Sequence, residues 1–278
     1  MLDTTTQACY RELATWMALR RGGDRCPVFG INGAQGSGKS TAAAFLRDEL
    51  ASAHGLRAVV LSLDDFYLPR AARLALAADV HPLLTRGVPG THEVSLGIAT
   101  VKQLQDLQAG QTLTLPRFSK AEDDRLPPGD WPLVEGPVDL LLFEGWCVGV
   151  PPQPPAELLP AINALEARED PDGRWRQIVN EQLAGPYADW FALLDALVFL
   201  QVPDFDCVRR WRWQQEQETA GQAGGAAAGL QTREQLDRFI QHYQRLTVQA
   251  LRELPARADV LLKLASDHSV SELRFRQT

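Results

Sequence analysis

The sequence predicts an α/β fold with three layers, in which a mainly parallel sheet lies between two layers of helices. Apolar strand-like segments alternate with helical segments along the chain, which is typical of parallel strands joined by right-handed crossovers. The length of 278 residues and the 45% share of hydrophobic residues are sufficient for a sizeable core. We expect residues 1–278 to form a single domain.

Apolar spacing and chain breakers place the elements in order. An N-terminal helix is expected within residues 1–24, chiefly over 8–20, because apolar residues recur at i, i+4 and two glycines follow. The elements expected after it are a strand at 28–31, a helix at 40–55, a strand at 57–63, a helix at 93–110, strands at 138–145 and 195–202, helices at 208–218 and 233–251, and a strand that ends near Leu264.

Three segments do not fit this alternation. The proline-rich residues 149–160 are expected to form an exposed connection. Residues 219–232 are rich in alanine and glycine, and we expect either a plain surface loop or the tip of a lid there. The residues after Leu264 are expected to be a surface appendage.

Composition and charge exclude several classes of function. The net charge of −7 provides no broad positive field for a nucleic-acid backbone. No apolar run approaches the ~20 residues that a membrane-spanning helix needs, and the N-terminus lacks a signal-peptide pattern. We therefore expect a cytoplasmic protein without a nucleic-acid or membrane partner. The four cysteines and five histidines show neither a disulfide framework nor zinc-ligand spacing.

A glycine-rich motif, GAQGSGKS at residues 33–40, stands between an expected strand and an expected helix. It fits the P-loop pattern G-x-x-x-x-G-K-[ST] in the context that this pattern requires. In such a loop the backbone N–H groups and the helix N-terminus hold a phosphate, the lysine neutralises the β- and γ-phosphates, and the hydroxyl binds Mg²⁺. The predicted nucleotide-binding residues here are Gly33, Ala34, Gly36, Ser37, Gly38, Lys39, Ser40 and Thr41.

Acidic residues follow two of the apolar strands. Glu144 ends the run LLLFE and is the candidate partner of Ser40 at a Mg²⁺ ion, either directly or through a water molecule. Asp64 and Asp65 follow the strand after the P-loop helix, where side chains point into the crevice in which open α/β sheets bind ligands. A carboxylate there is suited to accept the proton of an attacking hydroxyl, and we expect only one of the two aspartates to face the substrate.

Polar and basic residues gather in two further segments, RGVPGTHE at 86–93 and PRFSKAEDDR at 116–125. A helix N-terminus follows the first segment and favours an anion, and guanidinium groups such as those of the second pair with carboxylates through two hydrogen bonds. Taken singly, each basic residue also fits a solvated surface charge, and the histidine fits a capping or packing role. The candidate substrate residues are Arg86, Thr91, His92, Arg117, Lys120 and Arg125.

This ordered set of motifs resembles the P-loop kinases of small metabolites, which include uridine kinase, phosphoribulokinase, bacterial pantothenate kinase and plant-type glycerate kinase. The closer resemblance is to the D-glycerate 3-kinase family of plants, fungi and bacteria. It covers most of residues 28–250 and rests on SLDDFYLP at 62–69, HPLLTRGVPGTHEV at 81–94 and LPRFSKAEDDR at 115–125.

The resemblance implies a P-loop NTPase fold with a helical lid at residues 205–232. It implies that Asp64 is the catalytic base and that Asp65 has a supporting role. Arginines of the segment VRRWRWQQEQE are placed on the lid helix, and Arg212 is our candidate for reaching the phosphates when the lid closes.

We therefore expect an ATP-dependent kinase that uses Mg²⁺ and phosphorylates a hydroxyl of a small hydroxy acid, with the conversion of D-glycerate to 3-phosphoglycerate as the leading reaction. Lys39, Asp64 and Glu144 are the expected catalytic residues, and Tyr67 is a further candidate for contact with the substrate.

Two alternatives remain open. One is a nucleoside or pantothenate kinase, in which Tyr67, His92 and Trp146 line the acceptor pocket. The other is a regulatory protein that hydrolyses ATP slowly to change its shape.

Overall fold

The computed structural model describes residues 2–22, 25–222 and 232–276. Its main sheet is built from six strands, β1 (Val28–Gly33), β2 (Ala58–Ser62), β7 (Leu140–Gly145), β8 (Ala196–Gln201), β9 (Val260–Leu264) and β10 (Val270–Phe275). Their order is β10-β9-β8-β1-β7-β2, and every neighbouring pair is parallel except β9 and β10. Two small antiparallel pairs accompany the sheet, β3 (Thr112–Thr114) with β6 (Leu133–Glu135) and β4 (Phe118–Ser119) with β5 (Asp124–Arg125).

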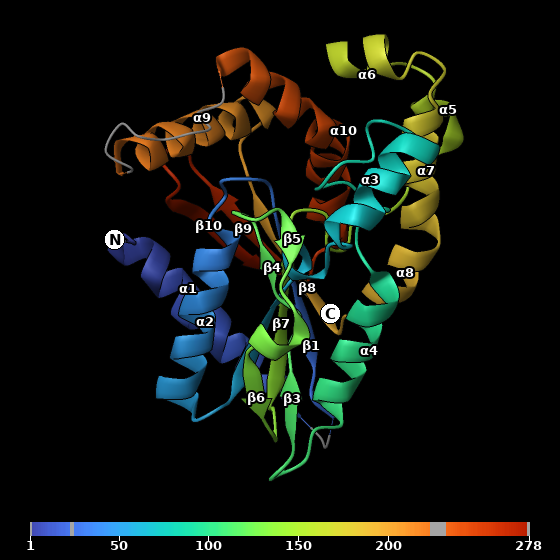
Figure 1. Cartoon of the computed structure of the whole chain (residues 1–278). Helices are drawn as coiled ribbons and strands as arrows, with labels where there is room; N and C mark the ends of the chain where they lie inside the picture. The colour runs from blue at the N-terminus through green and yellow to red at the C-terminus, as the bar shows by residue number, and fades with distance from the viewer. Residues whose placement is uncertain (1, 23–24, 223–231, 277–278) are drawn as a thin grey trace.

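Helices cover both faces of the sheet (Figure 1). They are α1 (Thr4–Leu19), α2 (Lys39–His54), α3 (Arg70–Asp79), α4 (Val94–Gln105), α5 (Pro155–Leu158), α6 (Ala164–Glu169), α7 (Arg174–Ala184), α8 (Pro186–Phe191), α9 (Phe205–Gln222) and α10 (Arg233–Arg257), with short 3-10 helices η1 (Leu63–Phe66) and η2 (Pro128–Asp130). Figure 1 shows α1 and α2 on one side of the sheet, α4 and α8 on the other, and α9 at the end opposite to β3 and β6.

Strand β7 shows how the two layers of helices are held. All six of its residues are buried, as expected for a parallel strand covered on both faces. Leu140 and Leu142 belong to the core shared with α1 and α2, whereas Leu141 and Phe143 belong to the core on the opposite face. There Phe143 stacks on Trp190 of α8, with ring centroids 4.8 Å apart. The predicted fold class, a mainly parallel sheet in a three-layer α/β/α arrangement, is confirmed.

Helix α1 begins earlier than the apolar spacing suggested. It starts at Thr4 because the side chain of Asp3 accepts a hydrogen bond from the backbone N–H of Thr6 and caps the helix. The strands and helices predicted between residues 28 and 264 are present, with shifts of a few residues at their ends.

The expectation for the residues after Leu264 was wrong. Residues Val270–Phe275 form β10, an antiparallel edge strand of the main sheet. Charged residues such as Glu272 and Arg274 made the segment resemble a surface appendage, but charge is common on edge strands because it prevents pairing with other chains. Helices α3 and α6–α8 were not predicted, and part of the proline-rich connection forms α5.

The expected lid segment, residues 205–232, is only partly described. Helix α9 forms its first part, whereas residues 223–231, which include most of the low-complexity segment, lie outside the described residues. In the described part of the chain, no helix combines the length and apolar character needed to span a membrane.

Candidate active site

The P-loop lies at the carboxyl end of β1, a fully buried strand in the middle of the sheet. Gly33 is packed so closely that a Cβ atom there would lie 2.4 Å from the Oγ atom of Ser37. Gly38 has a φ angle of 81°, a left-handed conformation that favours glycine, and α2 begins immediately after it at Lys39. The glycine-rich turn therefore leads directly into the N-terminus of a 16-residue helix, an arrangement that suits a phosphate group.

Three neighbouring strands bring the predicted catalytic residues to one edge of the sheet. Strands β1, β7 and β2 are adjacent and parallel. Glu144 lies near the carboxyl end of β7, and Asp64 follows β2 in η1. Carboxyl ends of parallel strands are where open α/β sheets bind their ligands.

Glu144 is buried, with 4% of its surface exposed. Its Oε1 atom accepts 2.9 Å hydrogen bonds from the hydroxyls of Ser40 and Ser62, whereas Oε2 has no hydrogen-bond partner among the described residues. A buried carboxylate oxygen without a donor is unfavourable unless a cation or a water molecule satisfies it. The oxygen atoms of Ser40 and Glu144 are also the type of ligand that Mg²⁺ prefers, so the two residues fit a magnesium site.

Asp64 is held by two hydrogen bonds. The hydroxyl of Tyr67 donates to Oδ1 at 3.1 Å, and Nζ of Lys120 donates to Oδ2 at 2.6 Å. Burial favours the neutral carboxyl group, but the positive charges of Lys120 and Lys39 outweigh this effect, so the pKa of Asp64 lies below its ordinary value. Asp64 is therefore ionised and can accept a proton.

Asp65 points to a different environment. Its Oδ2 atom accepts a 2.9 Å hydrogen bond from Arg117, and Oδ1 accepts one from the backbone N–H of Phe118. Burial raises the pKa of Asp65, and the charge of Arg117 opposes that rise. Arg117, a predicted substrate residue, pairs with Asp65 and lies outside the lining of the cavity described next, but it lines an adjoining cavity that shares Asp64 and Lys120 with it.

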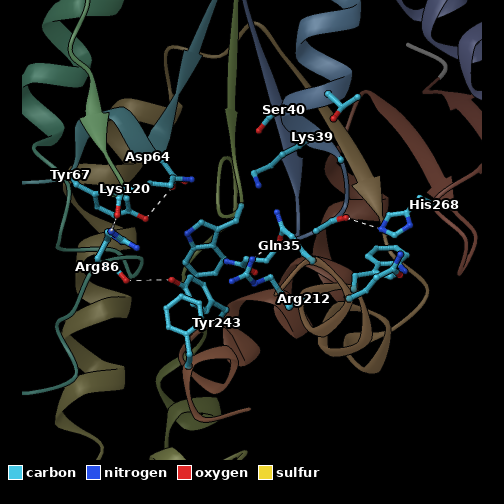
Figure 2. A pocket seen from close by; sticks show the side chains of 18 residues that line it. Gln35, Lys39, Ser40, Asp64, Tyr67, Arg86, Lys120, Arg212, Tyr243 and His268 are labelled. Atoms are coloured by element: carbon cyan, nitrogen blue, oxygen red, sulfur yellow. Dashed lines mark hydrogen bonds and ion pairs between the residues drawn. The ribbon is translucent and has the colours of Figure 1, made fainter. Parts of the chain in front are cut away.

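A cavity of about 480 Å³ opens beside these groups, a size typical of sites for small molecules. Figure 2 shows Asp64, Tyr67, Arg86 and Lys120 at one end, here called the aspartate end, and Arg212 and His268 at the other, with Lys39 between them. The rest of the lining consists of Gln35, Gly36, Gly38, Ser40, Thr41, Trp146, Trp211, Gln214, Gln215, Phe239 and Tyr243. The remaining predicted loop residues, Gly33, Ala34 and Ser37, are buried next to this lining.

The end opposite to the aspartates is formed by α9, the P-loop and the turn between β9 and β10. Nε2 of His268 lies 3.0 Å from the carbonyl oxygen of Gly36, and the His268 ring stacks on Trp211 with centroids 4.0 Å apart. Arg212 lines this end and contacts its helix neighbours Gln215 and Glu216.

The other two arginines of α9 lie elsewhere. Arg209 pairs with Asp237 of α10 at 3.1 Å, and Arg210 contacts the Sγ atom of Cys207. Neither of them lines the cavity.

The aspartate end rests on polar contacts between segments that are far apart in the sequence. Nη1 of Arg86 donates to Oδ1 of Asp123 at 2.7 Å, and the hydroxyl of Tyr243 donates to the backbone oxygen of Arg86. The indole N–H of Trp146 donates to the backbone oxygen of Gly87 at 2.9 Å. Arg86 and Lys120 are the basic side chains of this end among the described residues.

Thr91 and Arg125, two predicted substrate residues, are not brought to the cavity. The hydroxyl of Thr91 donates to the backbone oxygen of Val88, and the side chain is fully buried. Arg125 pairs with Glu93 at 2.6 Å and donates to the backbone oxygen of Tyr67. Both residues stabilise the loop on which the cavity is built.

His92 lies behind the cavity wall. Its ring stacks on Tyr67 with centroids 4.3 Å apart, and Nδ1 is hydrogen-bonded to the hydroxyl of Tyr187. Burial lowers the pKa of His92 to about 3, so the ring is neutral at physiological pH. His92 therefore fixes Tyr67, which in turn orients Asp64.

Several residues that line the cavity were not predicted from the sequence, among them Gln35, Phe239, Tyr243 and His268. Gln35 lies inside the P-loop motif, at a position that the motif leaves free. His268 is separated from its partner Gly36 by 232 positions in the sequence, and no local pattern marks it.

Comparisons with known proteins find relatives among kinases. The chain is 32% identical to a chloroplastic D-glycerate 3-kinase of Arabidopsis thaliana over 247 residues, which are 84% of this chain and 50% of that protein. It is 32% identical to an uncharacterized kinase, mug58, of Schizosaccharomyces pombe over 230 residues, 78% of each chain. A pantothenate kinase of Brucella ovis is 26% identical over 90% of this chain and 70% of its own. The chain thus spans about half the length of the Arabidopsis protein, and no protein-family model matches it.

Two solved structures share the fold. The structure of D-glycerate 3-kinase from Cryptococcus neoformans superposes with a TM-score of 0.76, at 24% identity, over 96% of this chain and 97% of its own. The structure of the YGR205w protein superposes with a TM-score of 0.77, at 24% identity, over 99% of this chain and 100% of its own. With a relative 32% identical over 78% of both chains, and with the P-loop in its strand–helix context, the chain belongs to the P-loop kinase family that includes D-glycerate 3-kinase.

Proposed function

We propose that this protein is an ATP-dependent kinase that phosphorylates a small hydroxy acid, with D-glycerate as the acceptor and 3-phosphoglycerate as the product. The position of Asp64 carries this proposal. Its ionised carboxylate lies in the same cavity as the P-loop, and Lys120, a cation suited to the acid group of an acceptor, contacts it at 2.6 Å. The names of the Arabidopsis and Cryptococcus relatives support the choice of D-glycerate.

The P-loop residues bind the phosphates of ATP in this proposal. The backbone around Gly36 and Gly38 and the N-terminus of α2 hold the phosphate oxygens, and Lys39 neutralises their charge. Arg212 adds a second positive charge from α9.

Ser40 and Glu144 would hold a Mg²⁺ ion, which when bound neutralises charge on the β- and γ-phosphates. The unpaired Oε2 atom of Glu144 supports this assignment, because it is a buried anionic oxygen without a donor. Ser62 keeps the carboxylate in place through its hydrogen bond to Oε1.

Asp64 accepts the proton of the acceptor hydroxyl in the transfer step. The acceptor oxygen forms a bond to the γ-phosphorus, the bond from that phosphorus to the β–γ bridging oxygen breaks, and the electron pair leaves with ADP. Tyr67 holds Oδ1 of Asp64, so the carboxylate keeps one orientation during this transfer.

An acceptor screen tests the proposal. ADP release is measured with D-glycerate, other hydroxy acids, nucleosides, pantothenate and no acceptor, and NMR identifies the phosphorylated carbon. We expect turnover that depends on D-glycerate and is lost in Asp64→Asn. Preferred use of a nucleoside or pantothenate would contradict the choice of acceptor, and ATP turnover that no acceptor changes would favour the regulatory ATPase.

A further inference from the structure

The two partners of Asp64 differ in how firmly they are held. Tyr67 is 4% exposed, and its ring is packed against those of His92 and Phe118. The side chain of Lys120, in contrast, is 66% exposed. An ion pair with so exposed a lysine contributes little to stability, so the hydrogen bond from Lys120 to Asp64 can be exchanged at small cost.

The turn that carries Lys120 is itself anchored. Asp123, at the end of this turn, pairs with Arg86 at 2.7 Å and with Arg73 at 3.2 Å. The next residue, Asp124, accepts a hydrogen bond from the backbone N–H of Arg70. Exchange of partners at Lys120 therefore requires movement of one side chain and leaves the turn in place.

Lys120 and Tyr67 together occupy the carboxylate of the proposed base. Lys120 occupies Oδ2 of Asp64 while Tyr67 occupies Oδ1, so both carboxylate oxygens already accept a hydrogen bond. Arg86, the other basic residue of the aspartate end, already has Asp123 as its counter-ion. A negatively charged acceptor that enters this end can therefore pair with Lys120, whose present partner is the carboxylate of Asp64.

We propose that the carboxylate of the acceptor replaces Asp64 as the ionic partner of Lys120, so that an acid acceptor itself releases the base. The inference rests on the proposed kinase function and names the substrate class: a hydroxy acid activates the site, whereas a neutral alcohol leaves Asp64 bound to Lys120. Lys120 is then a residue that determines specificity by positioning the acceptor.

The charges around Asp64 agree with this scheme. The charges of Lys120 and Lys39 make the two largest contributions that lower the pKa of Asp64. The acceptor carboxylate engages the first, and the phosphates of ATP engage the second. Asp64 therefore gains proton affinity as each substrate engages its lysine and gains most when both substrates are bound, which couples base strength to a complete site.

Matched acid and amide acceptors test the exchange. The probes are D-glycerate and D-glyceramide, which differ in charge and little in shape. We expect the parent enzyme to prefer the acid in kcat/KM, and Lys120→Met to reduce that preference on the order of 10- to 100-fold, the worth of a charge-assisted hydrogen bond. The loss falls on the acid, whereas turnover of the amide rises because Asp64 is no longer held by Lys120, and Lys120→Arg restores part of the preference. Lys102→Met, at an exposed position of α4 outside the cavity lining, is the matched control and leaves both values unchanged.

A binding measurement shows whether the acceptor competes with Asp64 for Lys120 or is only attracted by the charge of Lys120. If the acceptor competes with Asp64 for Lys120, Asp64→Asn removes the competitor, and calorimetry gives a dissociation constant for D-glycerate that is about two- to fivefold lower. Binding of the amide does not change, and the gain disappears in the double variant with Lys120→Met.

The outcomes distinguish this inference from the proposed function. Failure of the parent enzyme to phosphorylate any hydroxy acid overturns the kinase proposal itself. A parent enzyme that uses D-glycerate, together with an unchanged acid preference in Lys120→Met or an equal loss for both acceptors, overturns the exchange and leaves the kinase in place. Weaker binding of D-glycerate to Asp64→Asn also overturns the exchange.

Discussion

Asp64 and Asp65 are adjacent in the chain, yet their carboxylates bind different cations. Asp64 accepts from Lys120 at 2.6 Å and lines the cavity beside the P-loop. Asp65 accepts from Arg117 at 2.9 Å and from the backbone of Phe118. Asp64 thus lines the cavity, whereas Asp65 connects η1 to the segment that contains β4.

The two aspartates are expected to respond unequally to substitution. Asp64→Asn should lower kcat by about 10²–10⁴, the usual worth of a positioned base, with little change in ATP affinity. Asp65→Asn should affect kcat much less but lower the melting temperature, because Arg117 and the N–H of Phe118 lose a charged acceptor. Steady-state kinetics, nucleotide titration and thermal unfolding of both variants provide the measurement. A larger loss of kcat in Asp65→Asn, with ATP binding intact, would mean that the other carboxylate is the base.

The pH profile of kcat/KM follows from the charges around Asp64. Burial would raise its pKa, but Lys120 and Lys39 bring it below the ordinary value, which is about 3.9 for aspartate. Protonation of the base therefore causes no loss of activity above about pH 5. The neighbouring rings of Tyr67 and His92 do not change this, because burial raises the pKa of the first and lowers that of the second to about 3.

Lys120→Met removes the lysine charge that lowers the pKa of Asp64 the most. The pKa of Asp64 therefore rises, and the acid limb of the kcat/KM profile moves to higher pH. Profiles of kcat/KM for both enzymes between pH 4 and 9 check this expectation, and superimposable acid limbs would contradict it. The stability of the fold depends on pH in the same direction. Because the pKa of Asp64 is lower in the folded state, its ionisation stabilises the fold at pH values above the unfolded-state pKa, and this contribution is lost as the pH falls through the folded-state pKa.

Contiguous motifs allowed the local structure around the cavity to be predicted from the sequence. Gly33 to Ser40 form one uninterrupted turn and helix start, so their spacing alone specifies the local structure. Asp64 and Glu144 were predictable for a related reason: Asp64 follows one apolar strand, Glu144 lies at the end of another, and parallel neighbouring strands end at the same edge.

Other residues depended on packing that local patterns do not encode. Thr91 and Arg125 are polar residues in the expected segments, but their hydrogen-bonding groups are used by nearby backbone and by Glu93. Tyr243 and His268 reach the cavity from distant elements, through contacts with Arg86 and the P-loop. Such a side chain can be identified as part of the site only from the three-dimensional structure, which shows where its helix or turn lies.

Glu144→Gln is expected to raise the Mg²⁺ concentration that gives half-maximal activity. Glutamine keeps an oxygen that accepts from Ser40 and Ser62, so the fold is preserved, but the negative charge at the unpaired Oε2 atom is lost. Ser62→Ala is the matched control, because it removes one donor to Glu144 and leaves the proposed ligands unchanged. Magnesium titrations of the three proteins decide the matter, and identical curves for Glu144→Gln and the parent would remove this residue from the metal site.

The arginines of α9 provide a comparison within one helix. Arg212 lines the cavity, whereas Arg209 pairs with Asp237 outside the lining, although the two are three residues apart. If Arg212 contacts the phosphates more strongly during transfer than before it, Arg212→Ala lowers kcat by about 10-fold or more and raises the KM for ATP less. Arg209→Ala removes the same charge from the same helix and should leave both constants close to those of the parent. Equal effects of the two substitutions would show that the charge of α9 acts at long range, and raising the ionic strength would then weaken both effects together.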